Sequence, residues 1–241
     1  MHPLLPYNIF PSGDMAITIE FGHIINTAVN EVINTLYHFF YNNPFGGCVE
    51  VVPAYTSITI YYDPLVLSKQ VLNNETISAT ATRKIEEVIQ AAGRRQPQPN
   101  RELSVPVCYD PVFAIDMAAI AEHSKMNMQE IVTLHSGTKY RVYMLGFLPG
   151  FAYMGEVDER LNLPRKKMPQ KIASGSVGIT GRQTGIYPLN SPGGWNIIGR
   201  TPVQLFETSG DTIHTFFEPG DIVKFYPISK NEFKNYKGGS V

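Results

Sequence analysis

From Tyr140 onward, glycine or proline interrupts the chain every few residues. The segments between these residues are short and favour β-strands, and helical periodicity is absent from them. Regularly spaced turn residues without helices are typical of a β-barrel or a β-sandwich. The last such segment, residues 220–225, combines a turn with an apolar run and is predicted to be a closing strand. Most of the second half is therefore predicted to be all-β.

A charged, proline-rich stretch separates this region from the first part of the chain. Residues 93–101 (GRRQPQPNR) contain no large apolar side chain, and their alternating prolines favour an extended linker. The 241 residues are 43% hydrophobic and 17% charged, so both parts have enough apolar material for a core. We therefore predict two domains, residues 1–95 and residues 102–241.

The first part alternates between strand and helix patterns. The order β-β-α-β-β-α predicts a small, mainly antiparallel sheet with helices on one side. Nothing in this part brings reactive groups together, so it is predicted to be a scaffold or docking domain. The strands are expected at residues 4–10, 15–21, 48–52 and 56–62, and the helices after Asn26 and at residues 78–92.

The second part begins with a predicted strand at residues 103–108. Two short helical patterns follow it, at residues 115–123 and 128–135, before the glycine- and proline-rich region starts. Together with the first part, this organisation predicts the α+β fold class.

Charge and composition exclude several classes of function. A net charge of −1 without any basic block argues against binding to nucleic acid. Neither a signal peptide nor an apolar run of about 18 residues is found, so no membrane association is expected and the cytoplasm is the expected compartment. The six histidines show no i, i+4 pair, and no metal site is expected. Cys48 and Cys108 are interpreted as small buried residues.

Three segments are candidates for function: residues 146–155, 164–169 and 175–200. Dense glycines let a backbone approach a ligand closely and present N–H groups to an anion. Arg165, Arg182 and Arg200 lie in or beside these segments and suit a carboxylate or a phosphate. The alternative is that an all-β domain needs glycine and proline at its corners. The residues alone leave both interpretations open.

Motifs of known phosphate-binding and hydrolytic sites are absent. The chain contains neither a Walker A sequence nor a G-x-S-x-G nucleophile elbow. His135 follows Ile131 and Val132 on one face of a predicted helix. It is interpreted either as a buried core histidine or as a general base.

The motifs GFLPGFAYMG, SGSVGITGRQTGIYPLNSPGGW and IGRTP resemble the family of the bacterial 5-oxoprolinase B subunit. PSGDMAITIEFG, VVPAYTSITIYYDPL and GDIVKF extend the resemblance over nearly the whole chain. The family includes the sporulation-kinase inhibitor KipI and the first-subunit region of urea carboxylase and allophanate hydrolase. The resemblance implies a small α/β N-terminal domain followed by a cyclophilin-like C-terminal β-barrel.

The implied activity is the ATP-dependent opening of 5-oxoproline to glutamate, in which this chain acts with the A and C subunits of 5-oxoprolinase. ATP with Mg would be bound by the complex, and this chain would take part in the phosphorylation step. Arg165, Arg200 and the Gly193–Gly194 bend are expected to form one anion pocket. The expected catalytic residues are His135, Arg165 and Arg200, and the expected substrate-binding residues are Gln183, Thr184, Tyr187, Ser191, Gly193, Gly194 and Trp195.

Two further functions are compatible with the same resemblance. One is inhibition of a sensor histidine kinase by direct binding. The other is a role in a urea carboxylase or allophanate hydrolase system, for which this chain lacks a biotin-acceptor motif. The chain also departs from the family where a second Pro-Arg pair is usual. It has Pro169-Gln170-Lys171 there, so Lys171 would replace a bidentate arginine by a point charge.

Overall fold

The computed structural model describes residues 5–72, 74–93, 100–210 and 212–238. The chain divides into two compact units, residues 1–99 and residues 100–241. Most of the predicted linker, residues 94–99, lies outside the described residues. No helix among the described residues is long and apolar enough to cross a membrane.

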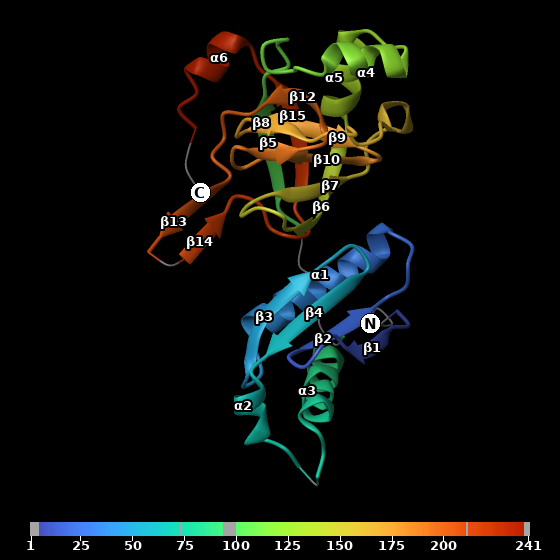
Figure 1. The fold of residues 1–241 in the computed structure, drawn as a ribbon, viewed down its shortest axis with the longest axis vertical. Helices are drawn as coiled ribbons and strands as arrows, with labels where there is room; N and C mark the ends of the chain where they lie inside the picture. The colour runs from blue at the N-terminus through green and yellow to red at the C-terminus, as the bar shows by residue number, and fades with distance from the viewer. Residues whose placement is uncertain (1–4, 73, 94–99, 211, 239–241) are drawn as a thin grey trace. The chain divides into compact units, whose positions relative to one another are not determined.

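The first unit contains a four-stranded antiparallel sheet with the strand order β1-β2-β4-β3 (Figure 1). Its element order agrees with the prediction except for one additional short helix, α2. Asp63 accepts hydrogen bonds from the first turn of α2, and Pro64 opens the helix, so Asp-Pro begins a helix as well as ending a strand. The elements are β1(Asn8–Pro11), β2(Ala16–Glu20), α1(Thr27–Asn42), β3(Cys48–Pro53), β4(Ser57–Tyr62), α2(Pro64–Ser68) and α3(Ile77–Ala92).

The core of this unit follows from the two periodicities in its sequence. Ile17 and Ile19 of β2 alternate with polar residues, and both are fully buried. The apolar stripes of α1 and α3 pack against the same cluster. Asn26 caps α1 as predicted, since its side chain accepts a hydrogen bond from the backbone N–H of Val29.

The second unit is built on a seven-stranded sheet with the strand order β12-β9-β10-β7-β6-β15-β5 (Figure 1). All neighbours are antiparallel except the parallel pair β15 and β5. The mixed α and β content agrees with the predicted fold class. The strands are β5(Glu102–Val107), β6(Lys139–Leu145), β7(Ala152–Gly155), β9(Ser176–Thr180), β10(Gln183–Ile186), β12(Asn196–Arg200) and β15(Ile222–Pro227).

The two edges of this sheet meet at Cys108 and Arg200. These residues exchange two backbone hydrogen bonds, with N···O distances of 2.8 and 3.0 Å. Gly199 permits the close approach, because a Cβ at this position would lie 2.7 Å from a Val107 methyl carbon. The curled sheet therefore closes where the IGR motif crosses the end of β5.

Two helices precede the glycine-rich region, close to where the sequence predicts them, and a C-terminal helix was not predicted. That helix, α6, has a capping box in which Ser229 and Glu232 bond to each other's backbone N–H groups. Two small two-stranded sheets, β8 with β11 and β13 with β14, complete the unit. These elements are α4(Met117–Ser124), α5(Met128–Gly137), η1(Glu159–Leu161), β8(Gln170–Ile172), β11(Ser191–Gly193), β13(Phe206–Ser209), β14(Thr212–Thr215) and α6(Lys230–Lys234).

Candidate functional site

Alternate residues of β7, β9, β10 and β12 face two different clusters. Successive side chains of a strand point to opposite sides of the sheet. Ala152 and Met154 therefore join the main core, whereas Phe151 and Tyr153 lie on the other face. Ile198 and Ile197 of β12 divide in the same way. The outer face thus carries a second apolar cluster, separate from the inside of the curled sheet.

Aromatic rings dominate this outer face. The ring of Phe151 meets those of Tyr187 and Trp195 edge-on, at centroid distances of 5.2 and 5.4 Å. Gly178 and Gly185 make room for Trp195, because a Cβ at either position would lie 3.1 Å from a carbon atom of its side chain. We call this cluster the aromatic platform, and it consists of Phe151, Tyr153, Tyr187 and Trp195.

The segment 164–172 runs beside the platform and is held at several points. The backbone N–H of Lys166 donates to the carbonyl of Gly194 (2.8 Å), and β8 pairs with β11. The Lys166 ammonium lies 2.5 Å from Oδ2 of Asp116, and both side chains are only 15% exposed. The same carboxylate oxygen accepts a hydrogen bond from the N–H of Ile197 (2.7 Å). This segment is therefore fixed to the sheet on both sides of Arg165.

Three cationic residues of this segment, Arg165, Lys167 and Lys171, are exposed to solvent. Burial raises the pKa of the Tyr153 and Tyr187 hydroxyls, and the nearby positive charge of Arg165 opposes this shift. Among the described residues, no carboxylate forms an ion pair with Arg165, Lys167 or Lys171. The segment therefore presents uncompensated positive charge beside the platform, and it suits an anionic ligand.

Ser191 adds a polar group to the same neighbourhood. Ser191 is 8% exposed, and its buried Oγ has no hydrogen-bond partner within the described part of the chain. Ser191 belongs to β11, opposite Ile172 of β8. A buried hydroxyl without a protein partner keeps its capacity to bond to a ligand group.

Arg200 has different surroundings from Arg165. Asn196 at the start of β12 donates to the carbonyl of Pro164 (3.0 Å), whereas Arg200 is the last residue of this strand. The Nε of Arg200 donates to the carbonyl of Ser174 (2.7 Å). Its guanidinium carbon lies 5.9 Å from the ring centroids of both Phe113 and Phe233. The segment of Arg165 thus bonds to Gly194 through the neighbouring Lys166, whereas the Arg200 side chain contacts Phe233 of α6.

His135 and Thr184 lie inside the curled sheet and are fully buried. Thr184 donates to the Gly178 carbonyl (3.2 Å), so its Oγ1 accepts from Nε2–H of His135 (3.0 Å). Nδ1 of His135 then accepts from the Tyr109 hydroxyl (2.8 Å). Burial lowers the pKa of His135 to about 3. This geometry favours the core interpretation of His135 over a general base.

Comparison with known proteins shows which family the chain belongs to. Residues 7–216 match the model of the carboxyltransferase domain, subdomains C and D. The chain is 37% identical to the B subunit of 5-oxoprolinase from Bacillus subtilis over 235 residues, which are 96% of this chain and 97% of that protein. The chain belongs to the 5-oxoprolinase B-subunit family. It is also 33% identical to the corresponding B subunit of Escherichia coli O157:H7, over 89% of this chain and 93% of that protein.

Solved structures agree with the family assignment. The structure of TTHA0988 matches 89% of this chain with a TM-score of 0.75 and 32% identity, and this chain spans 40% of the length of that protein. PH0987 from Pyrococcus horikoshii is 36% identical over 94% of this chain, with a TM-score of 0.53. Urea amidolyase of Kluyveromyces lactis, at 19% identity and a TM-score of 0.70, shares the fold.

In this member of the 5-oxoprolinase B-subunit family, the predicted site residues other than Gln183 fall into three groups. Arg165, Ser191, Gly193, Gly194, Tyr187 and Trp195 gather at the platform, His135 and Thr184 lie inside the sheet, and Arg200 lies beside α6. Gln183, on β10, is half-buried. Sequence reasoning missed Asp116, which stands 50 positions before its partner Lys166. No local pattern marks that pair. The alternation of Phe151 with Tyr153 was a usable signal for the platform.

Proposed function

We propose that this chain is the B subunit of an ATP-dependent 5-oxoprolinase, which opens 5-oxoproline to glutamate together with the A and C subunits. The observation that carries the proposal is the near full-length similarity to two proteins named as B subunits of 5-oxoprolinase. The family name itself implies a multi-subunit enzyme.

The groups at the platform suit the substrate. 5-Oxoproline carries a carboxylate beside a five-membered lactam. The exposed guanidinium of Arg165 can hold a carboxylate through two parallel hydrogen bonds. The neighbouring Lys167 and Lys171 supply point charges for a second anionic group, as a phosphate would require.

The chemistry explains why positive charge is useful here. A lactam carbonyl is a poor electrophile, and ATP supplies the phosphoryl group that activates it. The lactam oxygen forms a bond to phosphorus while the bond to ADP breaks, and water then attacks the activated carbon. Breaking of the C–N bond then opens the ring and leaves an acyl phosphate, which a second water hydrolyses to glutamate and phosphate. Arg165, Lys167 and Lys171 would stabilise the negative charge around the transferred group.

The proposal is tested by reconstitution. The purified A, B and C subunits are combined, and ADP and glutamate are measured with and without 5-oxoproline. We expect 5-oxoproline-dependent ADP release that requires all three chains. If mixtures with and without this chain have the same rate, the proposal is wrong.

A further inference from the structure

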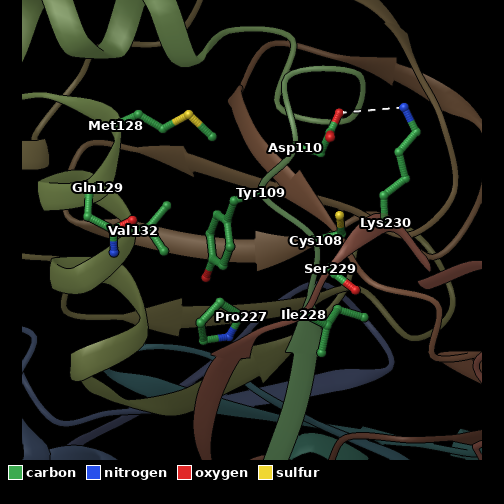
Figure 2. Close-up of a pocket in the computed structure, with 10 residues that line it drawn as sticks. All are labelled: Cys108, Tyr109, Asp110, Met128, Gln129, Val132, Pro227, Ile228, Ser229 and Lys230. Carbon is green, nitrogen blue, oxygen red and sulfur yellow. Dashed lines mark ion pairs between the residues drawn. The ribbon is translucent and has the colours of Figure 1, made fainter. Parts of the chain in front are cut away.

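A cleft of about 510 Å³ lies at the C-terminal end of β5, between α5 and the turn that joins β15 to α6 (Figure 2). Three segments far apart in the sequence line it: residues 108–110, 128–132 and 227–230. Its volume falls within the range of about 300–1,000 Å³ that is typical of small-molecule sites. The cleft contains none of the groups assigned above to the 5-oxoprolinase reaction, and a ligand could bind there whether or not the proposed function holds.

One wall of the cleft is fixed by the closure of the sheet. Cys108 is joined to Arg200 by two backbone hydrogen bonds. The next residue, Tyr109, is 4% exposed, and its hydroxyl is bonded to His135. The ring of Tyr109 is thus held in one position, and it lies between the two ends of the cleft (Figure 2).

The opposite wall is also held in place. The backbone N–H of Ile228 donates to the carbonyl of Val107 (2.9 Å). The ring of Phe233 in α6 packs on Phe113 at a centroid distance of 4.4 Å. Both walls are therefore anchored to the second unit, and the cleft is a preformed site.

The two ends of the cleft differ in chemistry. Met128 and Val132 of α5 supply apolar side chains at one end, where Gln129 also lies, and Asp110 and Lys230 make the other end charged (Figure 2). Oδ1 of Asp110 lies 3.8 Å from Nζ of Lys230, and the side chains are 36% and 42% exposed. This separation exceeds a hydrogen-bond distance. Oδ1 of Asp110 accepts one hydrogen bond from the backbone N–H of Val112 (3.0 Å), and both charged groups keep further hydrogen-bonding capacity for a ligand.

We propose that this cleft binds a free α-amino acid with an apolar side chain. The ligand ammonium would bond to Asp110, and the ligand carboxylate would bond to Lys230. Because both ligand charges are attached to one carbon, they match two protein charges that lie side by side. Two short charge-assisted hydrogen bonds would then replace one long ion pair. The ligand side chain would lie along the Tyr109 ring toward Met128 and Val132.

The test uses the full-length chain with labelled methionine methyl groups and L-leucine as the probe. We expect L-leucine to shift the Met128 methyl resonance with a Kd on the order of 1 mM or tighter. N-acetyl-L-leucine lacks the ammonium, and L-leucinamide lacks the carboxylate. Each should bind at least about tenfold more weakly. An unchanged Met128 resonance with L-leucine would overturn the proposal, as would equal binding of either analogue.

Variants at the charged end give an independent check. Asp110→Asn and Lys230→Met should each weaken L-leucine binding by at least about tenfold. Lys234→Met is the matched control, because Lys234 is exposed on the same short helix and does not line the cleft. The methyl resonance of the buried Met154 reports whether each variant is folded. Preferential binding of L-glutamate would contradict the apolar end of the site.

Discussion

The ring of Tyr187 lies directly against the backbone of Gly193. A Cβ at position 193 would come within 2.7 Å of Cζ of the tyrosine, whereas a Cβ at position 194 would find its nearest neighbour, the Lys166 carbonyl oxygen, at 3.5 Å. The first glycine of the SPGGW motif is therefore required by packing. This contact holds the β8–β11 strand pair close to the aromatic platform.

Gly193→Ala should destabilise the second unit, because the new methyl group must displace the Tyr187 ring. Overpacking of this kind costs about 1–3 kcal/mol. Trp195 is the only tryptophan of the chain, so its fluorescence in a urea titration reports the unfolding of this region.

Gly194→Ala is the matched control for this substitution. It should change the free energy of unfolding by no more than about 0.5 kcal/mol, as is usual where nothing is overpacked. Equal destabilisation by the two substitutions would show that Tyr187 does not set the requirement for glycine.

The buried His135 predicts a loss of stability in acid. Its pKa is lowered from 6.5 to about 3 by burial, so between these pH values the unfolded chain binds a proton that the folded chain does not. Stability due to this group is therefore lost as the pH falls below 6.5, by about 1 kcal/mol per pH unit once below about pH 6.

The slope is measured from urea unfolding at several pH values between 6.5 and 4.5. His135→Gln should reduce it, and His123→Gln, at an exposed position of α4, should leave it unchanged. Nitrogen NMR of the wild-type imidazole provides a second readout. A His135 ring that becomes protonated near pH 6 in the folded protein would contradict the prediction.

The two arginines predicted as catalytic should differ in their response to substitution. Arg165→Ala removes an exposed cation beside the platform, so we expect reconstituted 5-oxoprolinase activity to fall about 100-fold. The urea midpoint for unfolding of the Arg165→Ala variant should equal that of the wild type. Arg200→Ala removes a hydrogen bond to Ser174 and the contacts with Phe113 and Phe233, and should cost about 1–2 kcal/mol of stability.

Hydrogen exchange distinguishes these roles, because loss of Arg200 should accelerate exchange in α6. Arg160→Ala, in an exposed ion pair with Asp158, is the control for both readouts. If Arg200→Ala abolishes activity in a protein of unchanged stability, Arg200 belongs to the reacting site instead.

The Lys166–Asp116 pair should stabilise the segment that carries Arg165. Lys166→Met leaves Asp116 without its cation at a site that is 15% exposed, and we expect a cost of about 1–3 kcal/mol. Arg160→Met breaks a pair whose arginine is 62% exposed, and should cost less than about 1 kcal/mol. Equal values from Trp195-monitored unfolding would show that Lys166 does not anchor this segment.

The sequence by itself determined the local structure of this protein. Period-two alternation predicted that β2 is a half-buried strand, and helical spacing predicted the core faces of α1 and α3. Asn26 was identifiable as a helix cap because capping depends on a side chain and a backbone only three residues apart. The same alternation predicts that Phe151 and Tyr153 lie on one face of the sheet, and that Ala152 and Met154 lie on the other.

Only the tertiary structure decided which of these segments meet. The closure of the sheet at Cys108 and Arg200 joins residues 92 positions apart. The fold likewise brings together the distant partners of the Lys166–Asp116 pair and of the Asp110–Lys230 pair at the end of the cleft. Local patterns determine which way a side chain faces. The order and register of the strands determine what it faces, and those depend on the packing of the whole sheet.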